Sequence, residues 1–384
     1  MADALALAIS MERRIRILHL IDNLDLGGAQ TVLFNCLPYA DPKYEIVLAS
    51  LHGNRTALFW KRAHALGLPV VVLSPYRWLP AYLLSLPWLL WRKRFDIVQC
   101  HLFGSNLLGK PLAKLFRVPL VISHDHSHEF RFAWPLLLAL DRWANRFSDR
   151  VFVISEALLR RLHLEELIPE YKLIYLPNGV SASPPALRRS DHEAKIIGAA
   201  GRLVDWKNFD RFLRLARQLV SIDNGYRFLI AGDGPMLGCL QSLADELGIA
   251  DKVTWKGALP SLVPFFAEID FFVLTSDYEE LPMVALEAFA AQVPTALVSV
   301  NPAREARKRE ALCLDPRADE TNWASEIHTF LGQPDQVAKM VDSARALVDG
   351  QFSARAQIEK MEKVYESALG KKISRKDAKA PRED

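Results

Sequence analysis

The chain alternates short, continuous apolar runs with longer stretches whose apolar residues recur at helical spacing. An apolar run of about four to eight residues between turn residues is typical of a strand buried on both faces of a parallel sheet. In the first half, we expect strands at Ile15–Ile21, Glu45–Ser50, Val70–Leu73, Asp96–Cys100, Leu120–Ser123 and Val151–Ser155. Strands that alternate with helices in this way predict an α/β domain with a parallel sheet.

A second series of the same kind follows a polar, proline-containing stretch at residues 181–194. Its expected strands are Ile196–Ala199, Tyr226–Ala231, Val253–Trp255, Phe271–Leu274 and Thr295–Val298. The two series predict two Rossmann-like doubly wound domains that face each other across a cleft. We expect an N-terminal domain at residues 12–180, a linker at 181–194 and a C-terminal domain at 195–350.

The two ends of the chain differ from the rest. Apolar residues at helical spacing predict a final helix over residues 351–369, with Ser353 placed to cap it. Residues 1–11 carry Asp3 and have no basic start, so they make a poor signal peptide and are expected to be a disordered lead. Residues 370–384 are charged and lack an apolar period, which predicts a disordered tail.

Charge and cysteine content narrow the class of partner and the compartment. The chain has 48 lysines and arginines against 45 acidic residues, a balance that argues against nucleic acid as a main partner. Its four cysteines lack the spacing of a zinc site or a disulfide framework: Cys36, Cys100, Cys239 and Cys313. A reducing, cytoplasmic location fits this usage best.

The most apolar stretch runs from Trp78 to Trp91 and contains Pro80 and Pro87. It is shorter than the roughly 20 apolar residues that a membrane-spanning helix needs, so we predict no spanning segment. Tryptophans and leucines followed by a run of arginine and lysine at residues 92–94 are typical of a helix that lies on an anionic membrane. The alternative is an ordinary helix that buries its leucines against the sheet.

The first expected strand leads into a pair of glycines, Gly27 and Gly28, and the residues from Thr31 onward favour a helix. Glycines between a strand and a helix allow the backbone to approach a ligand whose negative charge the helix N-terminus favours. We therefore expect this loop to bind ligand. An ordinary tight turn is the alternative.

A comparable signal follows the first strand of the second half, where Gly201 is followed by Arg202 and Lys207. A guanidinium and an ammonium at a strand end can neutralise a diphosphate, although two solvated cations would have the same pattern. The next strand opens into a turn with Gly232 and Gly234. The third glycine of a dinucleotide-binding fingerprint is misplaced here, so a dehydrogenase is disfavoured.

Two glutamates, Glu279 and Glu287, flank the start of an expected helix near Pro282. Glu279 would lie in the preceding loop and Glu287 in the second turn of the helix. We expect the backbone N–H groups of the first turn to face phosphate or sugar hydroxyls, at Leu281, Pro282, Met283 and Val284. A capped helix with a solvated glutamate is the alternative.

Three histidines alternate in the loop after the fifth strand, His124, His126 and His128, and His101 closes the fourth strand. Because no cysteine or second histidine pair follows at metal-ligand spacing, we predict no metal site. His126 or His124 is instead expected to orient the acceptor or the donor sugar. His101 has a similar position, but a buried core histidine is the stronger interpretation for it.

Taken in order, these motifs resemble the retaining family-four glycosyltransferases of the GT-B fold, over about Ile15 to Leu369. The matching landmarks are Gly27-Gly28-Ala29-Gln30, Asp96-Ile97-Val98 with His101, Ser155-Glu156, Pro177-Asn178-Gly179-Val180, Gly201-Arg202 with Lys207, Gly232-Asp233-Gly234-Pro235, Gly257, and Glu279 with Glu287. The resemblance also implies that the final helix crosses back to the N-terminal domain.

The resemblance implies transfer of a sugar from a nucleoside diphosphate sugar with retention of configuration and without a tightly bound cofactor or metal. Arg202 and Lys207 would stabilise the diphosphate, Glu287 would contact the ribose, and Glu279 would lie near the donor sugar. The loop at Gly27 and Gly28 would close on the donor from the opposite domain. The donor would be a UDP- or GDP-sugar, and the acceptor a glycan or a lipid-linked carrier in cell-surface polysaccharide or glycolipid synthesis.

The chain departs from the family pattern where glycines are usual. Glu280 follows the first glutamate, Gln292 precedes the next proline, and residues 301–304 replace a glycine pair. Two alternatives therefore stay open, a nucleotide-sugar epimerase and a non-catalytic nucleotide-sugar binder. An epimerase would need an acid and a base that the sequence does not identify, whereas a binder would bind the donor without turnover.

Overall fold

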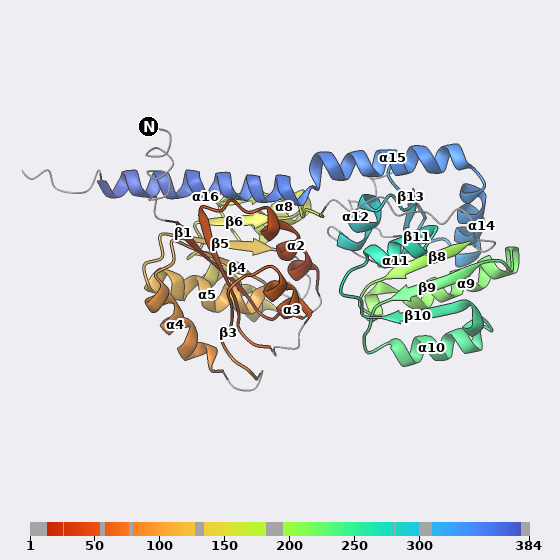
Figure 1. Ribbon diagram of the computed structural model, residues 1–384, viewed down its shortest axis with the longest axis horizontal. Helices are drawn as coiled ribbons and strands as arrows, with labels where there is room; N and C mark the ends of the chain where they lie inside the picture. The colour runs from red at the N-terminus through yellow and green to blue at the C-terminus, as the bar shows by residue number, and fades with distance from the viewer. Residues whose placement is uncertain are drawn as a thin grey trace, which may run out of the picture. The chain divides into compact units, whose positions relative to one another are not determined.

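A computed structural model of the chain describes residues 14–25, 27–53, 58–76, 80–126, 134–181, 195–277, 279, 282–298 and 309–377. The chain forms two compact units, unit 1 with residues 1–177 and 355–384 and unit 2 with residues 178–354. Each unit is an α/β structure with its own parallel sheet (Figure 1). The expected lead at 1–11 and residues 182–194 of the expected linker lie outside the described residues.

Unit 1 has a seven-stranded parallel sheet in the order β3-β2-β1-β4-β5-β6-β7. The strands are β1 (Ile15–Ile21), β2 (Tyr44–Ser50), β3 (Val70–Val72), β4 (Ile97–His101), β5 (Leu120–Asp125), β6 (Arg150–Val153) and β7 (Leu173–Tyr175). The chain builds from β1 out to β3 and then returns to β4 on the other side of β1. Open α/β sheets bind ligands at such a reversal, at the carboxyl ends of the strands.

The helices of unit 1 cover both faces of this sheet. They are α2 (Gly28–Cys36), α3 (Leu58–Ala65), α4 (Tyr82–Lys93), α5 (Phe103–Leu115), α7 (Pro135–Asn145), α8 (Glu156–Glu165) and α16 (Ala354–Asp377). Leu86 and Leu90 of α4 pack in one apolar cluster with Val98 of the sheet. Phe34 of α2 and Phe59 of α3 pack in a separate cluster, so α4 and α2–α3 cover opposite faces.

Unit 2 has a six-stranded parallel sheet in the order β10-β9-β8-β11-β12-β13. The strands are β8 (Ile196–Ala200), β9 (Arg227–Ala231), β10 (Val253–Gly257), β11 (Phe271–Leu274), β12 (Thr295–Leu297) and β13 (Leu312–Cys313). The order reverses between β8 and β11, which are adjacent. The carboxyl ends of these two strands are therefore where a ligand is expected.

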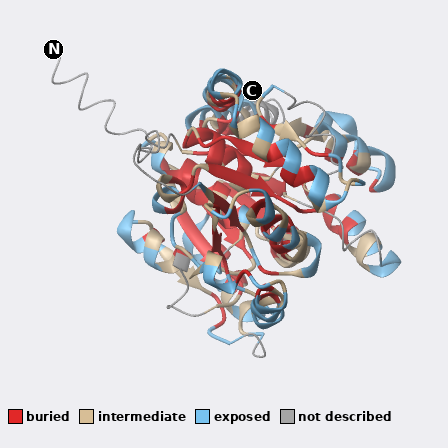
Figure 2. Cartoon of the chain, turned by 90° about the vertical axis from the view of Figure 1, so that its right-hand side faces the viewer, coloured by how far each residue is buried: buried red, intermediate tan, exposed pale blue. Residues whose placement is uncertain are grey.

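The helices of unit 2 are α9 (Phe209–Ile222), α10 (Leu237–Glu246), α11 (Val263–Glu268), α12 (Met283–Ala290), α14 (Glu320–Leu331) and α15 (Pro334–Gln351). Phe212 of α9, Phe228 of β9 and Trp323 of α14 are fully buried in one large cluster. The strands form the buried interior, and the outer turns of the helices are exposed (Figure 2). A core of this kind holds the strand ends rigidly.

The last helix, α16, belongs to unit 1 although it follows unit 2 in sequence (Figure 1). Met361 and Tyr365 of α16 are buried, and the Tyr365 hydroxyl donates a hydrogen bond to Gln99 of β4. The Cys36 thiol of α2 donates to Gln357 Oε1 at 2.7 Å. The return of the final helix to the N-terminal half agrees with the fold expected from the resemblance.

Two expectations about this helix need correction. The helix begins at Ala354, three residues later than expected, so Ser353, which also forms a parallel β-bridge with Val180, stands directly before the helix, where the cap was expected. The helix also continues past Leu369 to Asp377, so the prediction of disorder is wrong for residues 370–377. Gly370 costs only about 1 kcal/mol in a helix and does not end it.

The expected fold class is confirmed, since both halves form doubly wound parallel sheets. The sequence did not predict β7 and β13, which have three and two residues. The two residues of β13 are too few to carry a periodic signal, whereas β7 is as long as β3 and β12, which the sequence did predict. Among the helices that the structure describes, none combines the length and the apolar character needed to cross a membrane.

Candidate active site

The ends of β8 and β11 bring a lysine and a glutamate together in unit 2. Lys207 ends a short 3-10 helix (Asp205–Lys207) after β8, and Glu279 follows β11. The Lys207 ammonium forms an ion pair with Glu279 Oε1, and the Ser276 hydroxyl donates to the same oxygen at 3.0 Å. Both charged side chains are mostly buried, with 19% and 17% of their surface exposed. The pair is therefore held in a fixed place at the strand reversal.

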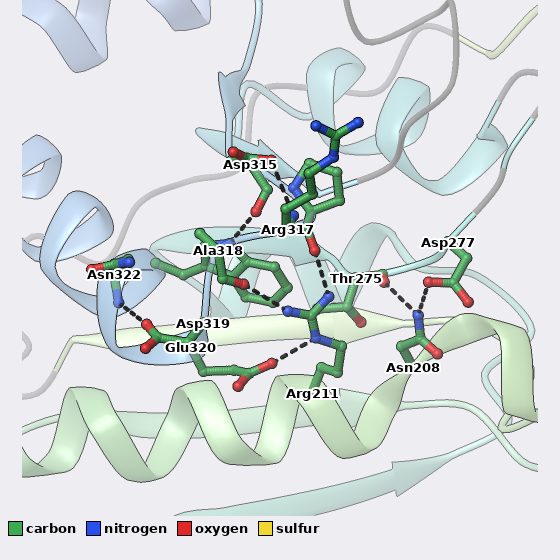
Figure 3. A network of polar contacts seen from close by, with 12 residues as sticks. Asn208, Arg211, Thr275, Asp277, Asp315, Arg317, Ala318, Asp319, Glu320 and Asn322 are labelled. Carbon is green, nitrogen blue, oxygen red and sulfur yellow. Dashed lines mark hydrogen bonds and ion pairs between the residues drawn. The ribbon is translucent and has the colours of Figure 1, made fainter.

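The backbone around this pair is held by Asn208 and Thr275. The Thr275 hydroxyl donates to the Lys207 carbonyl oxygen at 2.9 Å. Asn208 adopts a left-handed conformation, with φ of 50°, which asparagine tolerates better than most residues. Its side-chain amide donates to the Thr275 carbonyl at 3.3 Å and to Asp277 Oδ1 at 2.5 Å (Figure 3). These bonds tie the two loops to each other on both sides of the ion pair.

One turn further along α9, Arg211 fixes the helix to the segment before α14 (Figure 3). Its guanidinium donates to Glu320 at 2.6 Å and to the carbonyl oxygens of Pro316 and Ala318 at 3.1 and 2.9 Å. The guanidinium carbon also lies 3.9 Å from the ring centre of Trp323. This network holds the start of α9, and with it the loop that carries Lys207.

The glycines after β8 and β9 allow two loops to pack backbone against backbone. A Cβ atom at Gly232 would lie 1.9 Å from the Gly201 carbonyl oxygen, and one at Gly234 would lie 2.4 Å from the Leu203 carbonyl oxygen. Gly232 also has a φ of 150°, which disfavours other residues. Leu203 donates its N–H to Asp233 at 3.0 Å. The predicted site glycines are therefore needed for contact between the loops.

The amino end of α12 lies after β11, as the sequence predicted. Pro282 precedes the helix, and Ala285 and Leu286 donate the first helical bonds to its carbonyl oxygen. The N–H groups of Met283 and Val284 precede these bonds, so they are the donors that a helix start leaves for a ligand. Glu287 lies in α12 and is half-buried. Arg202 is exposed two residues after β8, and Leu281 lies outside the described residues.

Gln292, which stands where the family usually has glycine, ends α12. Its φ is 58°, in the left-handed region. Gln292 donates its N–H to Phe289 and Val293 donates to Ala288, which is the hydrogen-bond pattern of a Schellman cap. A glycine here would adopt this left-handed conformation at no steric cost, whereas glutamine pays a conformational cost to end the helix.

In unit 1, four histidines meet at the ends of β1, β4 and β5. His19 Nδ1 lies 3.1 Å from His101 Nε2, and His101 Nδ1 lies 3.4 Å from His126 Nε2. The ring of His124 stacks on that of His126, with centres 4.2 Å apart. Nitrogens of three of these rings lie within 4.8 Å of one another, close enough to hold a metal ion. Three histidines are a ligand set that zinc can use, and the absence of an essential metal stays a prediction from the sequence.

Burial keeps these rings neutral. It lowers the pKa of His19 and of His126 to about 4. Burial first, and then the neighbouring histidines, hold the pKa of His101 and His124 well below 6.5. His124 Nε2 and His126 Nδ1 are buried and have no hydrogen-bond partner in the described part of the chain. Neutral rings of this kind can accept or donate a hydrogen bond to a sugar hydroxyl.

The loop with Gly27 and Gly28 leads from β1 into α2. Gly27 is the residue before the helix, and its carbonyl accepts the N–H of Thr31 at 3.0 Å. The first turn of α2 has no acidic residue and no side-chain cap. Across the strand reversal, the Asp22 carboxylate accepts the N–H groups of Gly104 and Ser105 at 3.0 and 2.6 Å. Among the described residues, no side chain caps the first N–H groups of α2, so a ligand can bind them. At α5, by contrast, the Asp22 carboxylate already accepts the first N–H groups.

Sequence reasoning missed four polar residues that build these sites. His19 is the one histidine within β1, and a buried polar residue in a mostly apolar strand was its signal. Asn208, Thr275 and Ser276 flank the predicted Lys207 and Glu279. Their roles depend on which strands are adjacent, so no local pattern could have shown them.

Two family models match the chain, one in each half. The model described as Glycosyltransferase Family 4 matches residues 26–183, and the model described as Glycosyl transferases group 1 matches residues 186–347. Together, the two models cover every strand of both sheets except β1, and every described residue that the sequence assigned to a site.

Several known proteins are similar over much of their length. The 2-deoxystreptamine glucosyltransferase of Streptomyces kanamyceticus is 24% identical over 307 residues, which cover 73% of this chain and 75% of the relative. The UDP-Gal:alpha-D-GlcNAc-diphosphoundecaprenol alpha-1,3-galactosyltransferase of Escherichia coli is 25% identical over 250 residues, 57% of this chain and 62% of that protein. The crystal structure of Anabaena Alr3699/HepE in complex with UDP-glucose has a TM-score of 0.79 at 17% identity and covers 92% of this chain and 100% of that one. With both halves matched and this fold, the chain is a glycosyltransferase of family 4, built on the GT-B fold.

Proposed function

We propose that the chain transfers a sugar from a UDP- or GDP-sugar to a glycan or a lipid-linked acceptor, with retention of the anomeric configuration. The observation that carries this proposal is the Lys207–Glu279 pair at the strand reversal of unit 2, beside the start of α12. The names of two similar proteins support the donor class, since one is a transferase named for UDP-Gal and the other was crystallised with UDP-glucose. The first of these also acts on a diphosphoundecaprenol-linked sugar.

The reaction needs positive charge where the leaving group forms. The bond between the anomeric carbon and the β-phosphate oxygen breaks, and its electron pair stays on the diphosphate. The acceptor oxygen bonds to the anomeric carbon and gives its proton to the leaving diphosphate. Arg202, Lys207 and the N–H groups at the start of α12 would stabilise the added negative charge, as preorganised donors do. No tightly bound cofactor takes part in this scheme.

The two glutamates would have separate tasks. Glu279, which holds the Lys207 ammonium, would lie by the donor sugar, and Glu287 of α12 would accept hydrogen bonds from the ribose hydroxyls. In unit 1, His126 of the neutral histidine cluster would orient the acceptor hydroxyl. The loop with Gly27 and Gly28 would supply further backbone donors. This assignment gives unit 1 to the acceptor and unit 2 to the donor nucleotide.

A lipid-linked acceptor lies in a membrane, so we extend the proposal to an anionic membrane surface as a partner. The product would belong to a cell-surface polysaccharide or a glycolipid. The reaction would take place in the cytoplasm, at the cytoplasmic face of that membrane. In this setting the enzyme would be a peripheral hexosyltransferase.

Thermal unfolding in the presence of UDP- and GDP-sugars tests the donor. A ligand that binds the native state raises the midpoint by mass action, and the correct donor should raise it more than its nucleotide base alone. Nucleotide release that rises only when an acceptor is added would then show transfer. NMR of the product's anomeric proton reports retention. Binding without transfer to any acceptor would favour the non-catalytic binder, and a changed sugar on the released nucleotide would favour an epimerase.

A further inference from the structure

Three helices of unit 1 expose large apolar side chains outside the proposed transfer site. α5 packs against both α4 and α7, so the three helices lie in one layer on the sheet. Figure 1 shows α4 beside α5 at the edge of this layer. We use the name helix face for the exposed large apolar residues of this layer: Leu83, Leu84, Trp88, Trp91, Leu115, Trp134, Leu136 and Trp143.

The helix α4 has two apolar sides. Leu86, Leu89 and Leu90 are buried against the sheet, as an ordinary helix of an α/β domain requires. Leu84, Trp88 and Trp91 follow one another at helical spacing on the other side and are 82%, 59% and 64% exposed. The core therefore accounts for half of the apolar residues in this helix and leaves a second stripe without an intramolecular role.

The other two helices continue this stripe. Leu115, at the end of α5, is 72% exposed. Leu136 and Trp143, seven positions apart in α7, are exposed on the same helix side, and Trp134 precedes the helix. Soluble monomers rarely expose so many large apolar side chains in one layer without a binding partner.

The exposed charged residues of this layer are basic. In the described residues 80–94, 103–117 and 134–147 there is one acidic residue, Asp141, and its side chain is fully buried. The average composition of the chain would place about five acidic residues in these segments. The same segments expose six basic residues: Arg92, Lys93, Arg94, Arg117, Arg142 and Arg146.

We propose that the helix face docks the enzyme on an anionic lipid bilayer. Leucine and tryptophan side chains would enter the boundary between headgroups and acyl chains, and arginine and lysine would contact the lipid phosphates. A second copy of the chain fits less well, because a two-fold contact through this face would bring six cations against the same six. Nucleic acid would use the basic residues but leave the leucines in water.

This inference extends the proposed function by naming the surface that would bring the enzyme to a lipid-linked acceptor. It rests on the proposed function only for the reason why the enzyme would dock, since membrane binding itself does not require transfer activity. Donor binding takes place in unit 2, whereas the helix face belongs entirely to unit 1. Loss of membrane binding and loss of donor binding can therefore be measured separately.

The test is sedimentation of the full chain with vesicles of phosphatidylcholine alone and of phosphatidylcholine with phosphatidylglycerol, at low and high salt. We expect binding to the anionic vesicles at low salt and weaker binding at high salt. The triple variant Arg92→Glu, Lys93→Glu, Arg94→Glu should lower the partition coefficient at least about 30-fold, because each basic residue near an anionic surface adds to the free energy of membrane binding. Trp88→Ser with Trp91→Ser should lower binding and leave its salt dependence unchanged.

A matched control has the same change of charge on exposed positions of unit 2, in Arg214→Glu, Arg217→Glu, Lys339→Glu. It should sediment like the unaltered chain. Equal loss in both triple variants would mean that net charge, and not the helix face, drives binding, which would overturn the proposal. The proposal would also be overturned if the chain formed a concentration-dependent dimer that the tryptophan variant abolishes. Absence of binding to both kinds of vesicle would overturn it as well. The thermal shift with the donor should be the same in all variants. If the unaltered chain shows no shift with any donor, that result counts against the proposed function and not against membrane docking.

Discussion

Lys207 and Glu279 are 72 residues apart in sequence, and their side chains form an ion pair because they follow two adjacent strands, β8 and β11. The pair does more than join two loops. In the proposed mechanism it would keep an ammonium at the strand reversal before any donor arrives, so the cation would not have to be repositioned when the leaving group forms.

We expect Lys207→Ala to lower turnover at least tenfold, or about 1.4 kcal/mol in the barrier, and Arg202→Ala to do the same. In the proposed mechanism, each change removes a cation that would stabilise the leaving diphosphate. Steady-state kinetics with saturating acceptor measures it. The control is Lys256→Ala, which breaks an ion pair of 2.6 Å with Glu268 away from the strand reversal. Near-normal turnover in both site variants would exclude the proposed role of Arg202 and Lys207 in stabilising the leaving diphosphate.

The two glutamates should give different kinetic profiles. Glu279→Gln should chiefly lower kcat, because the charge near the donor sugar acts in the transition state. Glu287→Gln should mainly raise the KM for the donor, because a ribose contact is the same in the ground and transition states. Glu268→Gln is the matched control on α11. Two indistinguishable profiles would show that the roles are not separate.

Gly232→Ala should disrupt donor binding and destabilise unit 2 by at least about 2 kcal/mol, because the new Cβ would overlap the Gly201 carbonyl oxygen. Gly238→Ala is the control, since a Cβ added there would meet no atom within 4 Å and alanine favours the helix α10 by up to about 1 kcal/mol. Urea unfolding and the donor thermal shift measure the two effects. A fully stable Gly232→Ala variant would mean that the loops can separate at little cost.

Gln292→Gly should raise stability by about 0.5 to 1 kcal/mol and leave turnover unchanged, because glycine relieves the left-handed conformation at the helix end. Ala291→Gly, one residue earlier, has an ordinary φ of −80° and should destabilise instead. The free energy of unfolding in urea distinguishes the two. Faster turnover without a gain in stability would instead support a role for this position near the donor.

The histidine cluster predicts a loss of stability on mild acidification. The folded-state pKa of His19 is about 4, below the 6.5 of an unfolded chain, so the unfolded chain binds more protons between these values. Stability is complete above pH 6.5 and falls as the pH drops toward 4. For His19 alone, we expect about 2 kcal/mol less stability at pH 5 than at pH 7.5.

His19→Asn should reduce the difference in the free energy of unfolding between pH 7.5 and pH 5. Urea midpoints and slopes at each pH measure that free energy. His64→Asn, at an exposed position of α3, is the control and should leave the pH dependence as it is. A pH dependence that is the same in both variants would mean that other groups cause the acid sensitivity.

The strands could be predicted because each is a continuous apolar run between turn residues. Phe271–Leu274 has the predicted bounds, whereas β13, with two residues, is too short to show a period. Lys207 and Glu279 stood out through the family pattern, but their contact depends on the adjacency of β8 and β11. His124 and His126 are neighbours in the sequence itself, while the inclusion of His19 required the register of β1 with β4.

The position of α16 has a consequence for synthesis of the protein. Ile358, Met361 and Tyr365 complete the core of unit 1, yet they leave the ribosome only after the whole of unit 2. Unit 2 is a continuous segment from Asn178 to Ala354 and can fold as soon as it emerges, since domains fold as units during translation. Unit 1, although it is made first, must wait with an unfilled core for its final helix, and it would be the half that needs protection from aggregation in the meantime.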